Sequence, residues 1–277
     1  MRRKIEFGFY FIVLLFFIVR YSESDVDDRR VRAPASEPPA VLLPDDALLP
    51  RDEGAVLVEL DKTVHSGVGT AFAVDEVGTY VTARHVIDGC SEVFFVHSRG
   101  GLEKVASYVA ERNRDFAVIK AIGAGDFHLA LSGRELNRGI DGFMMGFPQG
   151  NPADVRATVI GRTEMRSSGR YRMREPVIAW VERERKPGFG GSLGGISGGP
   201  VFAADGSVVG TVVAGAPRRG RVYTTHPRVF GETGLLQNSR RGRTPALSDG
   251  ITARNYHSIG KTFRASGAIK QVYCKAS

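Results

Sequence analysis

Ser197 lies among glycines in the stretch GGISGGPVF, residues 194–202, which places one hydroxyl group in an unusually free backbone. Glycines on both sides let the chain turn tightly and let another backbone approach closely, and Pro200 stiffens the exit from the turn. A simple turn accounts for one or two glycines and not for this group. The pattern indicates a serine nucleophile for acyl transfer, with the amides of Gly195 and Ser197 as the predicted oxyanion donors.

Acyl transfer by a serine also needs a base that takes the hydroxyl proton and a carboxylate that orients this base. His85 follows an apolar strand-like run in YVTARHV, and Asp115 leads the apolar run DFAVIK. Each signal alone is weak, because a single histidine is commonly structural and an aspartate often marks a strand boundary. Together with Ser197 they predict a general base, His85, and an orienting acid, Asp115.

The same residues also fit the pattern G-x-S-x-G at 195–199, which is the nucleophile elbow of α/β-hydrolases. That fold needs its acid and then its histidine after the serine, and helices that alternate with parallel strands. The downstream candidates are Asp205, Asp249, His226 and His257. This esterase is the weaker alternative, because the neighbourhood is strand-like and His85 and Asp115 would have no role.

The stretches TARHV, RDFAVIK and GISGGPVF, in the order His, Asp, Ser, resemble the chymotrypsin-fold serine proteases over residues 55–225. The bacterial trypsin-like branch that includes the DegP/HtrA protease domains is the most similar. The resemblance implies a serine endopeptidase that acts on protein or peptide substrates without a cofactor. It assigns His85 as base, Asp115 as orienting acid, Ser197 as nucleophile, and Gly195 with Ser197 as oxyanion donors.

The resemblance extends to the substrate-binding side. Phe147 and Pro148, in MMGFPQG, resemble the family's Gly-Tyr/Phe-Pro turn, and Val213 to Gly215 resemble the strand that pairs with the substrate backbone. The substrate-binding residues implied are Val213, Ala214 and Gly215. The expected walls of the S1 pocket, residues 189–193 and 213–216, hold no acidic side chain, so we expect small or medium apolar P1 residues rather than Arg or Lys.

Two departures from the family pattern bear on regulation. Ile196 precedes the nucleophile, where secreted digestive relatives have an aspartate that pairs with a newly cut N-terminus. An isoleucine has no charge for that pairing, so activation by N-terminal cleavage is not expected. Roughly 80 residues follow Ser197, and completing the second barrel uses about half of them, so a PDZ domain of about 90 residues is not expected.

Short runs rich in Val, Phe and alternating apolar residues must position these side chains. They are AVLVEL (55–60), VGTAFAV (68–74), TYVTA (79–83), EVFFVH (92–97), DFAVIK (115–120), GFMMGF (142–147), VIAWV (177–181), GPVFA (199–203) and SVVGTVVAG (207–215). Repeated short strands without long helical segments predict an all-β sandwich or pair of barrels. With the resemblance, we expect two packed six-stranded antiparallel β-barrels, about 51–135 and 136–245, with the active-site cleft between them.

Residues 246–277 differ and are expected to form a C-terminal extension that packs on the barrels. Four apolar residues share one helical face after a cap at Ser248 or Asp249: Ile251, Tyr256, Ile259 and Phe263. The stretch AIKQVYC, residues 268–274, predicts a final strand.

The N-terminus predicts export. Basic residues at 2–4 precede an apolar run at 7–19, and acidic residues follow it. The run is shorter than the about 20 residues of a membrane span, and Ser22-Glu23-Ser24 offers a small-x-small cleavage site. Residues 1–24 are therefore predicted to be a signal peptide or a membrane anchor, and residues 25–50 a flexible linker. The expected location is the periplasm, free or anchored to the inner membrane.

Cys90 and Cys274 are the two cysteines. An even number in an exported chain favours a disulfide, which would fix the C-terminal tail to the segment around Cys90. The alternative is two unrelated thiols.

The chain carries a net charge of +8, with arginines gathered in 164–186 and 218–243. We interpret both segments as solvated, mobile loops rather than as sites for an anionic partner, because glycine, serine and acidic residues are interleaved. No aromatic and basic pattern of nucleic-acid binding is present. The remaining histidines lack metal-ligand spacing, so no metal site is predicted: His65, His97, His128, His226 and His257.

A protein that keeps the protease fold as a binding scaffold without turnover is the alternative from another functional class. The intact set of His85, Asp115 and Ser197 argues against it. The glycine-rich stretch 188–195 predicts a loop that is mobile until a substrate or partner orders it and that thereby gates activity.

Overall fold

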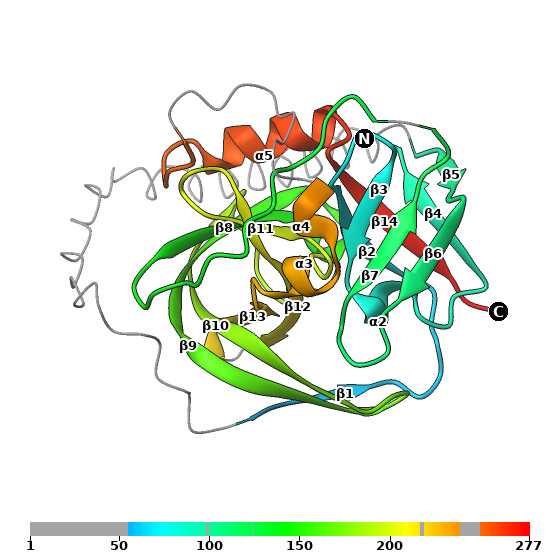
Figure 1. Cartoon of the computed structure of the whole chain (residues 1–277), viewed down its shortest axis with the longest axis horizontal. Helices are drawn as coiled ribbons and strands as arrows, with labels where there is room; N and C mark the ends of the chain where they lie inside the picture. Colours follow the sequence, from blue (N-terminus) through cyan, green and yellow to red (C-terminus); the bar gives the residue numbers. More distant parts are fainter. Residues whose placement is uncertain (1–54, 98–99, 124, 217–218, 239–249) are drawn as a thin grey trace, which may run out of the picture. The chain divides into compact units, whose positions relative to one another are not determined.

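The computed structural model describes residues 55–97, 100–123, 125–216, 219–238 and 250–277. Two sheets of seven strands each are the main secondary structure of this part of the chain (Figure 1). The first sheet contains β2 (Gly67–Ala73), β3 (Thr79–Thr82), β4 (Glu92–Val96), β5 (Leu102–Lys104), β6 (Ser107–Ala110), β7 (Ala117–Lys120) and β14 (Ile269–Lys275). The second contains β1 (Val56–Leu60), β8 (Asp141–Gly146), β9 (Ala153–Gly169), β10 (Met173–Lys186), β11 (Pro200–Phe202), β12 (Val208–Ala216) and β13 (Arg221–Thr225).

Helices are few and short. They are α2 (Arg84–Ile87), the 3-10 turn η1 (Pro148–Gly150), α3 (Val229–Glu232), α4 (Leu235–Asn238) and α5 (Tyr256–Ala265). Within the described ranges, none of them is long and apolar enough to cross a membrane. The predicted signal or anchor segment 1–24, the linker 25–50 and the predicted caps Ser248 and Asp249 lie outside these ranges.

The second sheet closes into a barrel of six strands. Its order is β9-β10-β13-β12-β11-β8, and β8 pairs again with β9, all antiparallel. β1 adds a seventh strand that runs parallel to the end of β9, from Val56 beside Met165 to Leu60 beside Gly169. The predicted all-β class with chymotrypsin-like sheets is confirmed. β1 lies within the range expected for the first barrel, 51–135, but it joins the second sheet as a seventh strand.

The first sheet contains the C-terminal strand of the chain. Its order is β5-β4-β14-β2-β3-β7-β6, and all neighbours are antiparallel. β14 lies between β2 and β4, with Cys274 opposite both Gly67 and Val93 (Figure 1). The C-terminal segment therefore forms the packed helix α5 and also contributes an internal strand, β14, to the first sheet.

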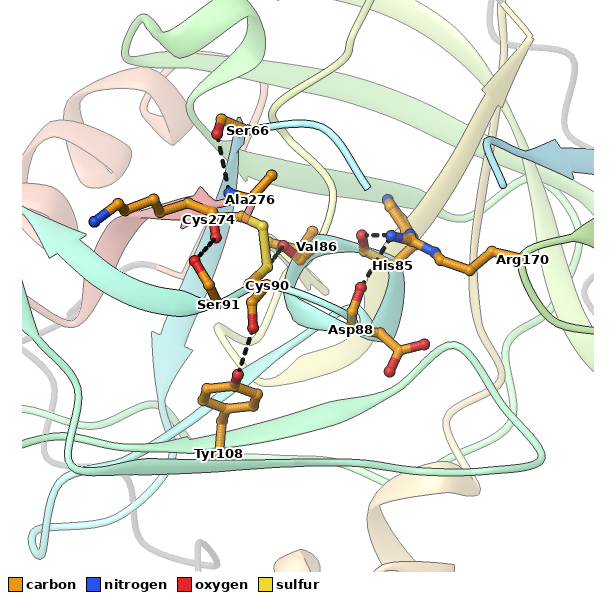
Figure 2. The surroundings of a disulfide bond; sticks show 11 residues. Ser66, His85, Val86, Asp88, Cys90, Ser91, Tyr108, Arg170, Cys274 and Ala276 are labelled. Carbon is orange, nitrogen blue, oxygen red and sulfur yellow. Dashed lines mark hydrogen bonds between the residues drawn. A yellow bond between two sulfur atoms is a disulfide. The ribbon is translucent and has the colours of Figure 1, made fainter. Parts of the chain in front are cut away.

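A disulfide joins Cys90 to Cys274, with their Cα atoms 5.5 Å apart. Cys90 lies shortly after α2 and Cys274 lies near the end of β14 (Figure 2). Hydrogen bonds support both ends: Tyr108 Oη donates to the Cys90 carbonyl at 3.0 Å, and the Ala276 amide donates to Ser66 Oγ at 3.0 Å. The disulfide thus fixes the C-terminal strand beside the helix that carries His85.

The interpretation of both basic segments as mobile loops is wrong for the parts that the structure describes. Residues 164–186 form the end of β9, the turn and all of β10 in one long hairpin (Figure 1). Met165 and Met173 are buried in it. Residues 221–238 form β13 and two short helices, α3 and α4. The hairpin alternates buried apolar side chains with exposed arginines, and this alternation keeps the charges in water while the strands pair.

Three clusters of buried side chains hold the sheets together. One fills the second barrel around Trp180, whose Nε1 donates to Thr224 Oγ1 at 2.9 Å. A second lies under β4, β7 and the β9–β10 hairpin. The third combines residues from both sheets with α5, including Phe72, Phe202 and Phe263. Because this third cluster draws on both sheets, burial of its apolar surface stabilises their mutual position.

α5 is anchored to the second barrel by a buried carboxylate. Asp154 on β9 is fully buried, and Arg264 donates to both of its oxygens, at 2.6 and 2.9 Å. The His257 ring lies 2.7 Å from the same carboxylate. Gly260 faces this group, and a Cβ there would lie 2.4 Å from Asp154 Oδ1. The cluster places α5 so that the chain enters β14 at the correct position.

Replacement of Arg264 tests this anchor. Arg264→Met leaves the Asp154 carboxylate buried with one partner fewer, so we expect unfolding stability to fall by about 3 kcal/mol in urea denaturation. The control is Arg228→Met, because Arg228 pairs with Glu135 at 3.6 Å on the surface and both side chains are largely exposed. The control should cost less than about 1 kcal/mol. Equal losses in the two variants would contradict the structural role of the cluster.

Candidate active site

The structure brings His85 and Asp115 together. His85 lies in α2, directly after β3, and Asp115 lies two residues before β7 with 2 % of its surface exposed. The His85 Nδ1 atom is 2.6 Å from Asp115 Oδ2, and the His85 backbone amide donates to Oδ1 at 2.8 Å. The carboxylate thus fixes the ring through Nδ1 and leaves Nε2 as the nitrogen that can act as a base.

The pKa of His85 is raised above its ordinary value of 6.5. Burial of the ring opposes this change and is the largest single influence, and Arg170 also opposes it. The charge of Asp115 and its hydrogen bond to the ring together outweigh both.

Ser197 lies in the loop before β11, and the buried residue Thr70 of β2 holds this loop. The Thr70 amide donates to the Ser197 carbonyl at 2.8 Å, and Thr70 Oγ1 donates to the Gly195 carbonyl at 2.8 Å. Thr70 Oγ1 also accepts from the Phe147 amide at 3.2 Å. One side chain of the first sheet therefore positions the serine loop of the second.

Glycine is required at two positions beside the serine. Gly195 has φ of +98°, and a Cβ there would lie 2.5 Å from the Phe147 carbonyl oxygen. Gly198 has φ of +84°, and a Cβ there would lie 2.2 Å from the Thr70 carbonyl oxygen. Both positions combine left-handed backbone with close approach of another chain segment, which any side chain would prevent.

The carbonyls of the serine loop point away from the reaction side. The Gly194 carbonyl accepts from the Gln149 amide at 2.5 Å, and the Ile196 carbonyl accepts from the Gly199 amide at 2.8 Å. The amides of Gly195 and Ser197, which belong to these same peptide groups, make no hydrogen bond within the described residues. Two donors are thus available beside Ser197, as an oxyanion site requires.

His85 and Ser197 line the same cavity of about 330 Å³. Its other walls come from residues 59–61, 63–65 and 67–68 and from Val86, Arg170, Gly194, Gly195 and Cys274. Within the described part of the chain, Ser197 Oγ makes no hydrogen bond to the His85 ring, and such bonds commonly tighten only when substrate binds.

A smaller pocket of about 110 Å³ adjoins Ser197 on its other side. Its apolar walls come from Leu193, Ile196, Val212 and Ala214, and Gly215 also lines it. Of the three residues predicted to bind substrate, Ala214 and Gly215 line this pocket. Val213 is instead 3 % exposed and packs into a hydrophobic cluster, so its side chain is directed away from the pocket.

The glycine-rich loop 188–195 is hydrogen bonded in the structure. Gln149 Nε2 donates to the carbonyls of Gly190 and Ser192 at 2.8 and 2.9 Å, and Arg185 donates to those of Phe189 and Gly191 at 3.3 and 2.9 Å. These two side chains hold the loop in a defined arrangement.

The turn of the long hairpin reaches the helix that carries His85. Arg170 donates to the carbonyls of His85 at 3.2 Å and Asp88 at 2.9 Å (Figure 2). Arg84 stacks on the Tyr171 ring, with its guanidinium carbon 3.7 Å from the ring centre. These contacts brace α2 from the second sheet.

The structure excludes the α/β-hydrolase alternative. The sheets are antiparallel except for the β1–β9 pair, whereas the nucleophile elbow requires a parallel sheet with alternating helices. Asp205 lies in an exposed turn and bonds Ser207, and His257 is engaged by Asp154. His226 is buried beside Glu135, and Asp249 lies outside the described residues.

The remaining histidines, His65, His97 and His128, lie in three different environments. His65 lines the larger cavity, His97 lies 3.3 Å from Glu103, and His128 is buried.

Several residues of the site carry no clear sequence signal: Thr70, Gln149, Arg170, Tyr171 and Glu175. Threonine in an apolar strand and arginine in a basic segment are unremarkable locally. Their roles arise from contacts between distant segments, and of the five only Thr70 and Glu175 are buried within strands.

Comparisons with known proteins agree with this geometry at the level of the family. The model of the trypsin-like peptidase domain matches residues 69–210, which include His85, Asp115 and Ser197. No curated protein matches the chain.

Solved structures with similar backbones include several proteases. The active form of the Rv3671c protease from M. tuberculosis is 16% identical, with a TM-score of 0.48 over 74% of this chain and 98% of that one. The HtrA-type protease AlgW with a decapeptide is 16% identical, with a TM-score of 0.46 over 62% and 52%. The MamO protease domain from Magnetospirillum magneticum is 18% identical, with a TM-score of 0.44 over 60% and 94%.

Similarities at these identities and TM-scores do not by themselves assign an activity. The match to the family model spans slightly more than half of the chain. The chain therefore belongs to the trypsin-like peptidase family and is a serine peptidase.

Proposed function

We propose that the protein is a serine endopeptidase of the cell envelope that cleaves peptide bonds through His85, Asp115 and Ser197. One observation carries the assignment of roles. One cavity is lined by His85, which Asp115 holds at 2.6 Å, and by Gly195 and Ser197, whose amides are unbonded. A base, its orienting acid, a nucleophile and an oxyanion site are the components that acyl transfer needs.

In the first half of the reaction, Ser197 Oγ attacks the carbonyl carbon of the scissile peptide bond while His85 Nε2 takes its proton. Negative charge develops on the carbonyl oxygen, and the amides of Gly195 and Ser197 donate to it. His85 then gives its proton to the leaving amine, and an acyl-enzyme remains on Ser197.

In the second half, water takes the place of the amine. His85 removes a proton from this water as it attacks the acyl carbon, and the proton then returns to Ser197 Oγ as the carboxylic acid leaves. Asp115 keeps the ring in one tautomer and stabilises its positive charge in both halves.

The apolar pocket beside Ser197 supports a preference for small or medium apolar P1 residues. Its walls carry no charged side chain that could pair with Arg or Lys. The AlgW structures with bound peptides concern a protein of the same general fold, and we extend peptide binding to this chain as part of the proposal. Location in the envelope depends on the predicted export segment 1–24.

Labelling with a fluorophosphonate tests the nucleophile. Ser197 should be labelled in the wild-type protein, and Ser197→Ala and His85→Ala should abolish labelling because one lacks the nucleophile and the other its base. Intact mass and fluorescence would report the adduct. A well-folded wild-type protein that is not labelled would instead favour the binding scaffold without turnover.

The pH dependence of kcat/KM tests the base. His85 must be neutral to accept the proton, so activity should fall as the pH drops through its pKa, and the midpoint should lie above 6.5 because Asp115 raises that pKa. His65→Gln is the control, since His65 lines the same cavity but has no hydrogen bond to Asp115. Loss of the acid limb in the control would show that His85 is not the titrating group.

A peptide library tests the specificity. Cleavage should follow small and medium apolar residues, and Ala214→Leu should reduce cleavage after the medium residues by about tenfold or more, because a filled pocket costs on the order of 1–3 kcal/mol. Cleavage after alanine should fall less. Strict cleavage after Arg or Lys would be inconsistent with an apolar S1 pocket at this place.

A further inference from the structure

Glu175 is a buried acid that lies directly behind Asp115. It belongs to β10 of the second sheet, and 6 % of its surface is exposed. Its Oε1 atom accepts a hydrogen bond from the backbone amide of Asp115 at 2.9 Å. Asp115 precedes β7 of the first sheet, so this hydrogen bond joins the two sheets at the proposed acid of the triad.

Asp115 is held on both its side chain and its main chain. His85 contacts both carboxylate oxygens, and Tyr171 Oη donates to Oδ1 at 3.5 Å. Glu175 holds the amide. The orientation of the carboxylate toward His85 therefore depends on a backbone position that Glu175 fixes.

The carboxyl groups of Glu175 and Asp115 lie close together, and this affects the pKa of Glu175. Burial, with a further contribution from the charge of Asp115, raises the pKa of Glu175 from 4.5 to about 8, although the Asp115 amide and Arg114 act in the opposite direction. Glu175 is therefore mainly neutral at pH 7 and can accept from the Asp115 amide without placing a second charge beside it.

A cavity of about 200 Å³ adjoins Glu175, so water can reach its carboxyl group. Six titratable or charged groups face Glu175 across this cavity or through direct contact: Asp115, Arg114, Arg174, His226, Arg228 and Glu232. Burial lowers the pKa of His226 below 6.5, so its ring is already neutral when Glu175 begins to ionise. Arg114 is engaged by Glu232 through a hydrogen bond of 2.5 Å.

We propose that Glu175 is a positioning residue for the triad: its carboxyl group holds the Asp115 main chain across the two sheets and thereby keeps the Asp115 carboxylate directed at His85. The proposal rests on the proposed function and deepens it. Glu175 lies behind the acid and touches neither Ser197 nor the cavity that His85 and Ser197 share, so it acts through Asp115.

Two consequences follow from ionisation of Glu175. Activity should fall on the alkaline side as the pH rises through about 8, because a second negative charge repels the Asp115 carboxylate. Stability should fall as well. Above pH 4.5 the unfolded state has lost the Glu175 proton, which the folded state still keeps. The contribution of Glu175 to the free energy of unfolding is therefore complete below pH 4.5, declines as the pH rises, and is lost above about 8.

Three variants separate these effects in the full chain. Glu175→Gln keeps an oxygen acceptor for the Asp115 amide and cannot ionise. Glu175→Leu removes the acceptor at similar size. Glu232→Gln is the matched control, because Glu232 faces the same cavity but is half-exposed and bonds Arg114 rather than Asp115.

The measurements are kcat/KM against pH, thermal unfolding at pH 5.5 and 9, and the proton resonance of His85 Nδ1 in NMR spectra. At pH 7 the kcat/KM of Glu175→Gln should stay within about twofold of wild type, and it should not fall as the pH rises through about 8. The kcat/KM of Glu175→Leu should be lower by about tenfold or more, because the hydrogen bond to the Asp115 amide is missing. Glu175→Gln should unfold close to wild type at pH 5.5 and several degrees higher at pH 9. Glu232→Gln should keep the wild-type dependence on pH in each measurement.

An alkaline limb that persists in Glu175→Gln, or an equal stability difference at both pH values, would overturn the proposal. The NMR and unfolding measurements need no turnover. In the wild type the His85 Nδ1 resonance should show a step near pH 8 in addition to the step from the titration of His85 itself, and Glu175→Gln should show only the latter, even if the protein is a scaffold without turnover. Should Glu175→Leu fail to fold, the comparison of Glu175→Gln with wild type still decides the question.

Discussion

The hydrogen bonds of Thr70 are the interaction on which the geometry of the site depends. A triad divided between two sheets works only if the sheets are aligned to within a fraction of an ångström, and apolar packing alone is not directional. Thr70 is in the sheet that carries His85, and its amide and hydroxyl hold the carbonyls of Ser197 and Gly195. The oxyanion site depends on a second pair of contacts, because the amides of Gly195 and Ser197 share their peptide groups with the carbonyls that the Gln149 and Gly199 amides hold.

Contacts from the second sheet complete this junction from the other side. Arg170 holds the carbonyl of His85, and Glu175 holds the amide of Asp115. Both come from the long hairpin of β9 and β10, which extends past its own barrel toward the first sheet (Figure 1). The arginine-rich segment thus supports the groups that are proposed to be catalytic, His85 and Asp115. Some of its arginines, such as Arg170, donate hydrogen bonds to backbone carbonyls. A hydrogen bond from a cationic donor is stronger than one from a neutral donor.

The C-terminal strand makes the first sheet depend on the end of the chain. β14 pairs with both β2 and β4, and the disulfide fixes it beside α2. The Asp154 cluster in turn positions α5, which leads into β14. Because pairing over such sequence separations has a high cost in loop-closure entropy, the covalent link and the buried ion cluster both favour the closed arrangement.

Local sequence patterns were sufficient for the strands whose apolar residues alternate or run together, and for the glycine nest around Ser197, since only glycine tolerates φ near +98° at Gly195 beside the Phe147 carbonyl. The roles of His85, Asp115 and Ser197 were implied by the family resemblance that their order and flanking residues carry. The even number of cysteines favoured the pairing of Cys90 with Cys274, which the structure contains.

Only the tertiary structure decided the rest. The strand β14 was expected as a strand, but its place between β2 and β4 depends on edges that are defined only once the sheet forms. Arginines in 164–186 looked like a solvated loop, because composition does not show that every second residue faces a core. Thr70 and Glu175 acquire their roles from partners 125 and 60 residues away in the sequence, and no local period or propensity encodes contacts at that distance.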